Sequence, residues 1–202
     1  MIYILLIICG VIIGYGLEWF SVFSLQGRDF TRMKYGKHCT AVVFGMLLPL
    51  LWYISDSSEA FIIGVVLAAL MIIVTLTDMM AMLILNKTLL LFVFPIIILR
   101  SIFPLENGLV SSISGALLAF VILAVLAIAS KGQVGGGDVK LYTLLGFFFG
   151  MNAVLVHLFL ACILAIIGTL CLILLKKKRR IDAISFAPYI ALASMVMVII
   201  GG

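Results

Sequence analysis

Two aspartates could do chemistry because each lies at the edge of a long apolar run. Asp78 ends one run, and Asp138 begins another after three consecutive glycines, Gly135, Gly136 and Gly137. A charged side chain at the centre of a spanning helix costs at least about 2.5–3.5 kcal/mol, so a carboxylate in such a place is a functional candidate. If the two carboxyl groups meet, they tend to hold one proton, because like charges at short range disfavour double ionisation. The ionised group can then activate water while the protonated group donates to a carbonyl, which hydrolyses a peptide without a metal or covalent intermediate.

The glycine run before Asp138 suits a polypeptide substrate. Glycine permits close approach of another backbone and unusual dihedral angles. An extended substrate could pair with residues 134–137, since irregular backbone at membrane depth is tolerated only where it lines a watery cavity or is buried in protein. We therefore expect Gly135, Gly136 and Gly137 to contact substrate.

Simpler roles are open for the same polar residues. Asp138 could only cap the start of its helix, and Asp78 could only mark a helix end at the level of the lipid headgroups. Asn86, eight residues after Asp78, is expected to cap the next helix, whether or not it also touches substrate. Lys140 could steady a carboxylate, or its side chain could extend to phosphate headgroups.

The composition identifies the elements that must position these residues as membrane helices. The chain has 202 residues, of which 66% are apolar and 10% charged, against about 45–50% and 25% in soluble domains. Its mean hydropathy is +1.42. This argues against a large soluble domain, a nucleic-acid-binding module or a secreted disulfide scaffold. We predict an all-α polytopic membrane helix bundle, formed by residues 1–202 as a single domain.

About eight crossings are expected, since a spanning helix needs roughly 20 apolar residues. The stretch 139–175 is too long for one helix and has no charge after Lys140, so we place a turn near Gly150 and Asn152. The first run is expected to be a retained helix rather than a signal peptide. The apolar runs cover about 2–23, 41–55, 60–77, 88–103, 109–129, 139–151, 153–175 and 184–201.

Basic residues set the sides of these crossings. The loops 24–40, 78–88, 130–140 and 176–182 hold all of the 13 Lys and Arg residues except Arg100. Cytoplasmic loops are rich in Lys and Arg, so we expect these loops and both aspartates at the cytoplasmic face, and both termini outside. The basic cluster 176–180 is expected to anchor this topology and could also bind anionic lipid. Topology therefore explains the net charge of +5 better than a nucleic-acid partner.

The remaining reactive side chains indicate no metal site or cofactor. None of the four cysteines forms a C-x-x-C pair, so we expect buried, inert thiols rather than metal ligands or disulfides. His157 is isolated within its apolar run and is expected to have a packing role. The cysteines are Cys9, Cys39, Cys162 and Cys171.

Three segments resemble motifs of the type IV prepilin peptidase family. The members of this family are membrane aspartic proteases of the GxGD class. Residues 135–141, Gly-Gly-Gly-Asp-Val-Lys-Leu, resemble its GGGDxK(L) motif. Asp78 with Asn86 is similar to the first motif, in which Asp is followed eight residues later by Asp or Asn, usually after Pro; here Leu85 replaces the Pro. Residues 185–189, Ser-Phe-Ala-Pro-Tyr, resemble the late element P-F-G-P-[FY]. The three segments occur in the family's order, and the eight-helix plan also matches.

The resemblance implies an endopeptidase that removes the leader of prepilin or pseudopilin precursors at the cytoplasmic face. Asp78 and Asp138 would be the catalytic pair. We assign substrate binding to Lys140, Asn86 and the three glycines. Many bacterial members also methylate the new N-terminus and carry a long first cytoplasmic loop with two C-x-x-C pairs. Here residues 24–40 contain Cys39 alone, which implies a short form without zinc and argues against methyltransferase activity.

Two other functions use the same residues differently. A small proton- or cation-coupled carrier could bind its ion at Asp78 and Asp138, although no internal symmetry or midplane carboxylate supports it. An inactive scaffold of a pilus assembly machine would keep the fold without the chemistry. An endopeptidase would cleave a precursor, and a carrier would move ions across a membrane. A scaffold would do neither.

Overall fold

A computed structural model shows seven helices and, within the residues it describes, no strand. Those residues are 1–31, 33, 36–105, 107–131, 134–175 and 185–201. The fold class predicted from the sequence, an all-α bundle, is confirmed. The helices are α1 (Ile2–Ser24), α2 (Gly36–Ile54), α3 (Ser58–Ala81), α4 (Asn86–Ile102), α5 (Gly108–Ala129), α6 (Gly136–Leu174) and α7 (Ala187–Gly201).

Five of these helices are long and apolar enough to span a membrane, as judged by length and composition: α1, α2, α3, α5 and α6. The helices α4 and α7 have 17 and 15 residues, fewer than the roughly 20 of a perpendicular crossing. The chain therefore has the elements of a multi-pass membrane protein. The expected number of eight crossings stays a prediction.

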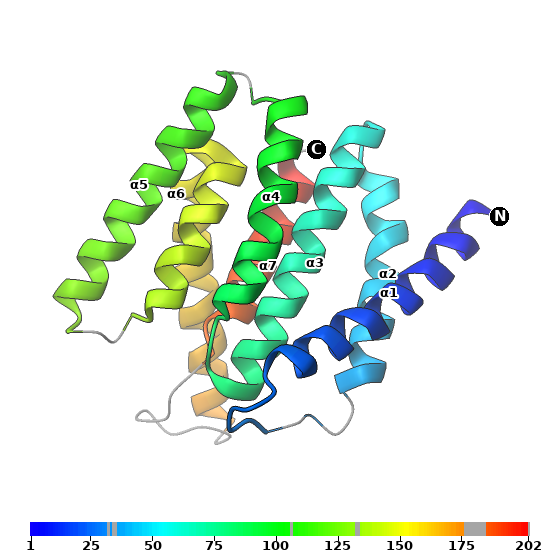
Figure 1. Ribbon diagram of the computed structural model, residues 1–202, viewed down its shortest axis with the longest axis horizontal. Helices are drawn as coiled ribbons and strands as arrows, with labels where there is room; N and C mark the ends of the chain where they lie inside the picture. Colours follow the sequence, from blue (N-terminus) through cyan, green and yellow to red (C-terminus); the bar gives the residue numbers. More distant parts are fainter. Residues whose placement is uncertain (32, 34–35, 106, 132–133, 176–184, 202) are drawn as a thin grey trace.

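The long helix α6 is broken at Gly150, where the turn was expected. Gly150 has φ 80° and ψ 177°, a conformation outside the helical region that glycine adopts without steric cost. The two halves of α6 run in opposite directions, so both of its ends lie at the lower end of the bundle in Figure 1. The expectation of two helical segments within residues 139–175 is confirmed.

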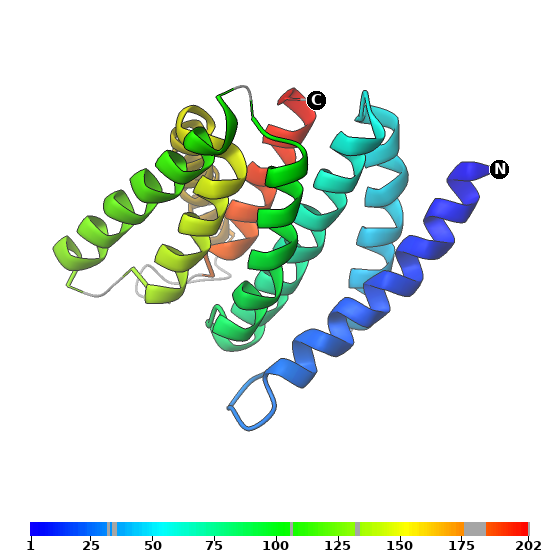
Figure 2. The ribbon, with the colours of Figure 1, turned by 45° about the horizontal axis from the view of Figure 1, so that its top comes forward.

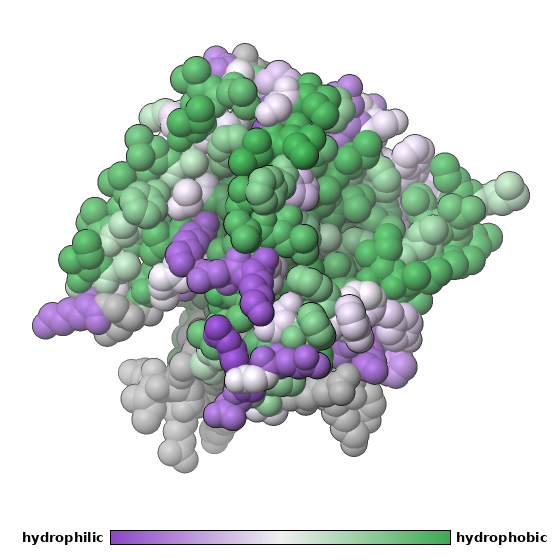
Figure 3. Space-filling model, in the orientation of Figure 1, coloured by the Kyte–Doolittle hydropathy of each residue, from purple (hydrophilic) through white to green (hydrophobic). Residues whose placement is uncertain are grey.

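The connections expected on one side of the membrane lie at one end of the bundle. The helices α1, α3 and α5 end there, and α2, α4, α6 and α7 begin there (Figure 1). In Figure 3, hydrophilic residues gather mainly toward this end and hydrophobic residues cover most of the lateral surface. The basic cluster 176–180 lies outside the described residues.

Small residues bring the outer helices close to their neighbours. The helix α1 crosses α2 obliquely at the edge of the bundle (Figure 2). A Cβ on Gly10 would lie 2.7 Å from the Cα of Gly45, and a Cβ on Gly14 would lie 2.7 Å from the Cα of Ala41. Because lipid tails are as apolar as the helices, such close van der Waals packing is a main source of helix association in a membrane.

The central helix α3 contacts α1, α2, α4 and α7, and thereby connects most of the bundle. Its side chains Leu67, Leu70 and Ile73 pack in a core with Leu141 and Tyr142 of α6. The end of α3 and the beginning of α6 are therefore held by buried side chains. Both carry an aspartate.

The expectation that the cysteines are buried is wrong. All four are exposed on α1, α2 and α6: Cys9, Cys39, Cys162 and Cys171. A spanning helix is apolar on every side, so an apolar neighbourhood in the sequence does not distinguish the core from the lipid-facing surface.

Candidate active site

Asp78 lies in the last turn of α3, with its side chain 9% exposed. The helix ends three residues later, at Ala81, because Met82 adopts a left-handed conformation (φ 51°, ψ 39°) and its N–H donates to the carbonyl of Asp78 at 2.8 Å. The main chain of Asp78 thus helps to close the helix. Its buried carboxyl group is left for contacts with other elements.

Two donors from the beginning of α7 hold one oxygen of Asp78. The hydroxyl of Ser185 donates to Oδ2 at 2.6 Å, and the backbone N–H of Ala187 donates to the same oxygen at 3.0 Å. Ala187 is the first residue of α7, and the first N–H groups of a helix have no partner within it. The motif at residues 185–189 did not indicate this contact with Asp78.

Asp138 lies in the first turn of α6, half-buried, and its position differs from that of a helix cap. Gly135 is the N-cap residue, and the N–H of Asp138 donates to the carbonyl of Gly135 at 3.0 Å. The charge of Asp78 acts electrostatically on the Asp138 carboxyl group. Two carboxyl groups far apart in the sequence therefore lie at the same end of the bundle, within electrostatic range of each other.

The three glycines before Asp138 have different surroundings. A Cβ on Gly137 would lie 2.8 Å from Ile84 Cβ, so this glycine allows α6 to pack on the α3–α4 connection. A Cβ on Gly135 would lie 3.1 Å from Asp138 Oδ2. Gly136 faces open space, with no atom within 4 Å of such a Cβ. Only Gly136 has free room for another backbone.

Lys140 and Asn86 bind each other. The ammonium of Lys140 donates to Asn86 Oδ1 at 3.0 Å and so links the first turns of α6 and α4. The expectation that Asn86 caps α4 is wrong, because Leu85 is the N-cap residue and Asn86 is the first residue of the helix. The interaction between segments so distant in the sequence was not indicated by either motif.

A polar cavity and an apolar groove are lined by residues next to the two aspartates in the sequence, although neither aspartate itself lines them. The cavity has a volume of about 510 Å³ and is lined by residues that include Arg28, Asn86, Gly136, Gly137 and Lys140. The groove has a volume of about 390 Å³ and lies between α2, α3 and α7. Its lining includes Met79 and Pro188, the neighbours in sequence of Asp78 and Ala187. One hollow is polar and the other apolar, and each is lined by a direct sequence neighbour of one aspartate.

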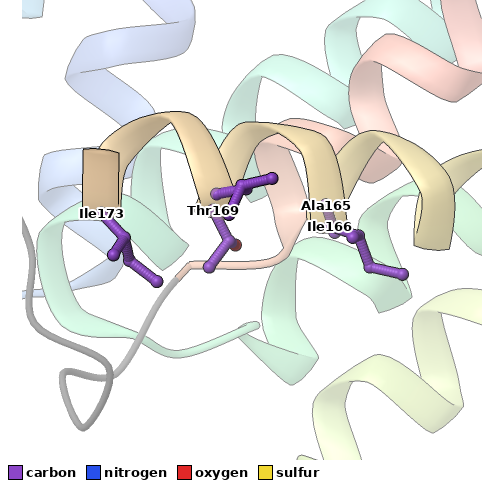
Figure 4. Close-up of a pocket in the computed structure, with 5 residues that line it drawn as sticks. Ala165, Ile166, Thr169 and Ile173 are labelled. Atoms are coloured by element: carbon purple, nitrogen blue, oxygen red, sulfur yellow. The ribbon is translucent and has the colours of Figure 1, made fainter. Parts of the chain in front are cut away.

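A third depression lies on the second half of α6 (Figure 4). Its five lining residues belong to that helix and provide one hydroxyl, that of Thr169, and no acidic or basic group. We therefore assign no chemistry to it. Within the part of the chain that the structure describes, no three His, Cys, Asp or Glu side chains form a group that could hold a metal.

The expected packing role of His157 is confirmed. The side chain is fully buried, and its Nε2 lies 2.9 Å from the hydroxyl of Ser194. Its ring stacks on Phe149 with 5.0 Å between the ring centroids. His157 therefore joins the second half of α6 to α7 and to the first half of α6, away from the carboxyl groups.

A known protein family has a sequence model that matches the part of the chain with both aspartates. The model of the type IV leader peptidase family matches residues 65–170, which is about half of the chain and contains both aspartates and the glycine run. The chain belongs to the type IV leader peptidase family. The family match covers α3 to α6 almost completely and therefore includes the helices that carry Asp78 and Asp138.

Individual relatives of the leader peptidase family are larger than this chain. The prepilin leader peptidase/N-methyltransferase of Bacillus subtilis (strain 168) is 33% identical over 138 residues, which are 68% of this chain and 55% of the relative. The protein of the same name from Aeromonas salmonicida (strain A449) is 29% identical over 99 residues, 48% of this chain and 34% of the relative. The chain thus spans about half, or less, of the curated relatives that it matches. No solved structure matches it.

Proposed function

We propose that this chain is a membrane aspartic endopeptidase that removes the leader peptide of prepilin or pseudopilin precursors. The observation that carries the proposal is that Asp78 and Asp138 lie at the same end of the bundle, within electrostatic range of each other, while two glycines of the run before Asp138 line a polar cavity. Membership in the leader peptidase family supports the same reaction class.

The proposed reaction needs only the two carboxyl groups and water. The ionised group takes a proton from a water molecule, whose oxygen adds to the peptide carbonyl carbon. The protonated group gives its proton to the carbonyl oxygen. When the tetrahedral species collapses, the C–N bond breaks, and the amine leaves with the proton that the first group had taken. The hydroxyl formed from the carbonyl oxygen returns its proton to the second group, which restores the pair and leaves a carboxylic acid as the other product. The polar cavity of about 510 Å³ is the proposed source of the water.

In this proposal the precursor lies across both the polar cavity and the apolar groove. An extended peptide around the scissile bond is placed along Gly136, the glycine that faces open space, with Lys140 and Asn86 at the edge of the same cavity. The apolar segment that follows the cut is placed in the groove between α2, α3 and α7, because this groove reaches Met79, next to Asp78.

The orientation follows from the distribution of charge. We propose that the site faces the cytoplasm and that both termini lie outside, because the four sequence segments expected at the cytoplasmic face, two of which contain Asp78 and Asp138, hold all Lys and Arg residues except Arg100. Anionic lipid is the proposed partner of these basic connections. We propose peptidase activity alone, without methyl transfer, since the segment 24–40, which includes the start of α2, is short and contains a single cysteine.

Co-expression of the chain with a candidate prepilin tests the proposal. Asp78→Asn and Asp138→Asn are nearly isosteric, so both proteins should accumulate, and each should lose at least about 100-fold of the cleavage rate. Asp29→Asn is the matched control, because Asp29 is an exposed acid in the connection between α1 and α2. Mass spectrometry of the product locates the cut.

Persistent cleavage by either Asp78→Asn or Asp138→Asn would remove that residue from the catalytic pair. If the chain is instead a carrier that uses the same carboxyl groups, the opposite results are expected. It would move protons or cations across liposomes that contain the purified protein, and it would leave every precursor intact.

A further inference from the structure

The contact between Asp78 and the segment before α7 has the geometry of a strong, charge-assisted hydrogen bond. The distance of 2.6 Å between Ser185 Oγ and Asp78 Oδ2 lies in the range of about 2.5–2.7 Å that is typical of hydroxyl–carboxylate pairs. The second donor, the N–H of Ala187, reaches the same oxygen at 3.0 Å. Both donors come from residues more than 100 positions away in the sequence.

One of the two donors to Asp78 belongs to the main chain, and the other belongs to a side chain. Any residue except proline at position 187 provides the backbone N–H, whereas only a side chain with a donor provides the contact at position 185. Ser185 stands where the late family element has Pro, whose side chain has no donor. The hydroxyl contact is therefore a property of this chain and is not implied by its resemblance to the family.

Two donors on one oxygen fix the plane of the carboxylate better than one. A single hydrogen bond leaves the group free to rotate about the axis through Oδ2, while a side-chain donor and a main-chain donor together oppose that rotation. In the described part of the chain, Oδ1 accepts no hydrogen bond. Oδ1 is thus the oxygen left to bind the attacking water.

We propose that Ser185 is a positioning residue, whose hydroxyl orients the Asp78 carboxylate so that Oδ1 faces the water. The inference rests on the proposed peptidase function, and it assigns to Asp78 the role of the ionised group that activates the water. Orientation matters because a reacting group must be held close to its productive geometry, and a small misplacement costs a large factor in rate. Ser185 itself touches neither water nor substrate in this scheme.

The test uses the purified full chain in detergent and a precursor that the wild-type protein cleaves. We expect Ser185→Ala to lower kcat about 10- to 100-fold, the effect of one hydrogen bond to a charged group, and to leave KM within about twofold. Ser185→Gly, which also lacks the hydroxyl, should match it. Ser185→Thr keeps the hydroxyl and should recover most of kcat. Ser101→Ala, which removes an exposed hydroxyl from α4, is the matched control.

The outcomes separate the inference from the proposed function. If no precursor is cleaved by the wild-type protein, the proposed function fails and the inference fails with it. Cleavage by the wild-type protein with an unchanged kcat in Ser185→Ala would overturn the inference alone. A change in KM alone would also overturn the inference. The same holds if Ser185→Thr is as slow as Ser185→Ala while both variants unfold at the wild-type temperature.

Discussion

A single methyl group added at Gly137 should displace the start of α6. A Cβ there would lie 2.8 Å from Ile84 Cβ and 3.3 Å from the carbonyl oxygen of Ile84. Non-bonded carbon atoms in contact are normally about 3.5–4.0 Å apart, so α6 and the α3–α4 connection must separate by roughly 1 Å. The residue that follows Gly137 is Asp138, and it moves with the helix.

The expected effect on activity is large and the effect on stability small. A misplacement of about 1 Å can cost about 100-fold in rate, so we expect Gly137→Ala to lower kcat by about that factor. Replacing glycine by alanine within a helix contributes up to about 1 kcal/mol of stability, which offsets part of the cost of the contact. Gly136→Ala adds its methyl group to the open space that we propose for the substrate backbone, so it should raise KM and should lower kcat much less than Gly137→Ala does.

The assay measures kcat and the unfolding temperature of both variants on one precursor. Gly16→Ala serves as the control, because Gly16 is a helical glycine of α1 with no atom within 4 Å of an added Cβ. A kcat of Gly137→Ala within about threefold of the wild-type value would refute the argument from packing. Equal losses in Gly136→Ala and Gly137→Ala would instead assign the glycine requirement to contact with the substrate.

Two further predictions concern the bundle and the apolar groove. A Cβ on Gly146 would meet the main chain of Gly115 and lie 2.9 Å from Ala119 Cβ, so Gly146→Ala should destabilise the protein by about 1–3 kcal/mol, seen as a lower unfolding temperature than that of Gly16→Ala. Ala191→Phe fills part of the groove between α2, α3 and α7 and should raise KM several-fold with little change in kcat, whereas Ile199→Phe, on an exposed position of α7, should not.

The sequence alone predicted the helices, the turn at Gly150 and the connections that share one end of the bundle. These features depend on local properties: the length of each apolar run, the presence of glycine where a turn is needed, and the alternation of sides in a chain that crosses repeatedly. The same alternation predicted that Asp78 and Asp138 lie at the same end. The confirmed features thus depend only on where a residue lies along the membrane normal.

Only the tertiary structure decided which side chains meet at that end. The donors to Asp78 from residues 185 and 187, the pairing of Lys140 with Asn86, and the packing of Gly137 on Ile84 depend on how each helix is rotated about its axis. Hydropathy does not report this rotation in a membrane, because the lipid-facing and core-facing sides of a spanning helix are both apolar. For the same reason the four cysteines were wrongly placed in the core, and the contact of Ser185 with Asp78 depends on α7 lying beside α3.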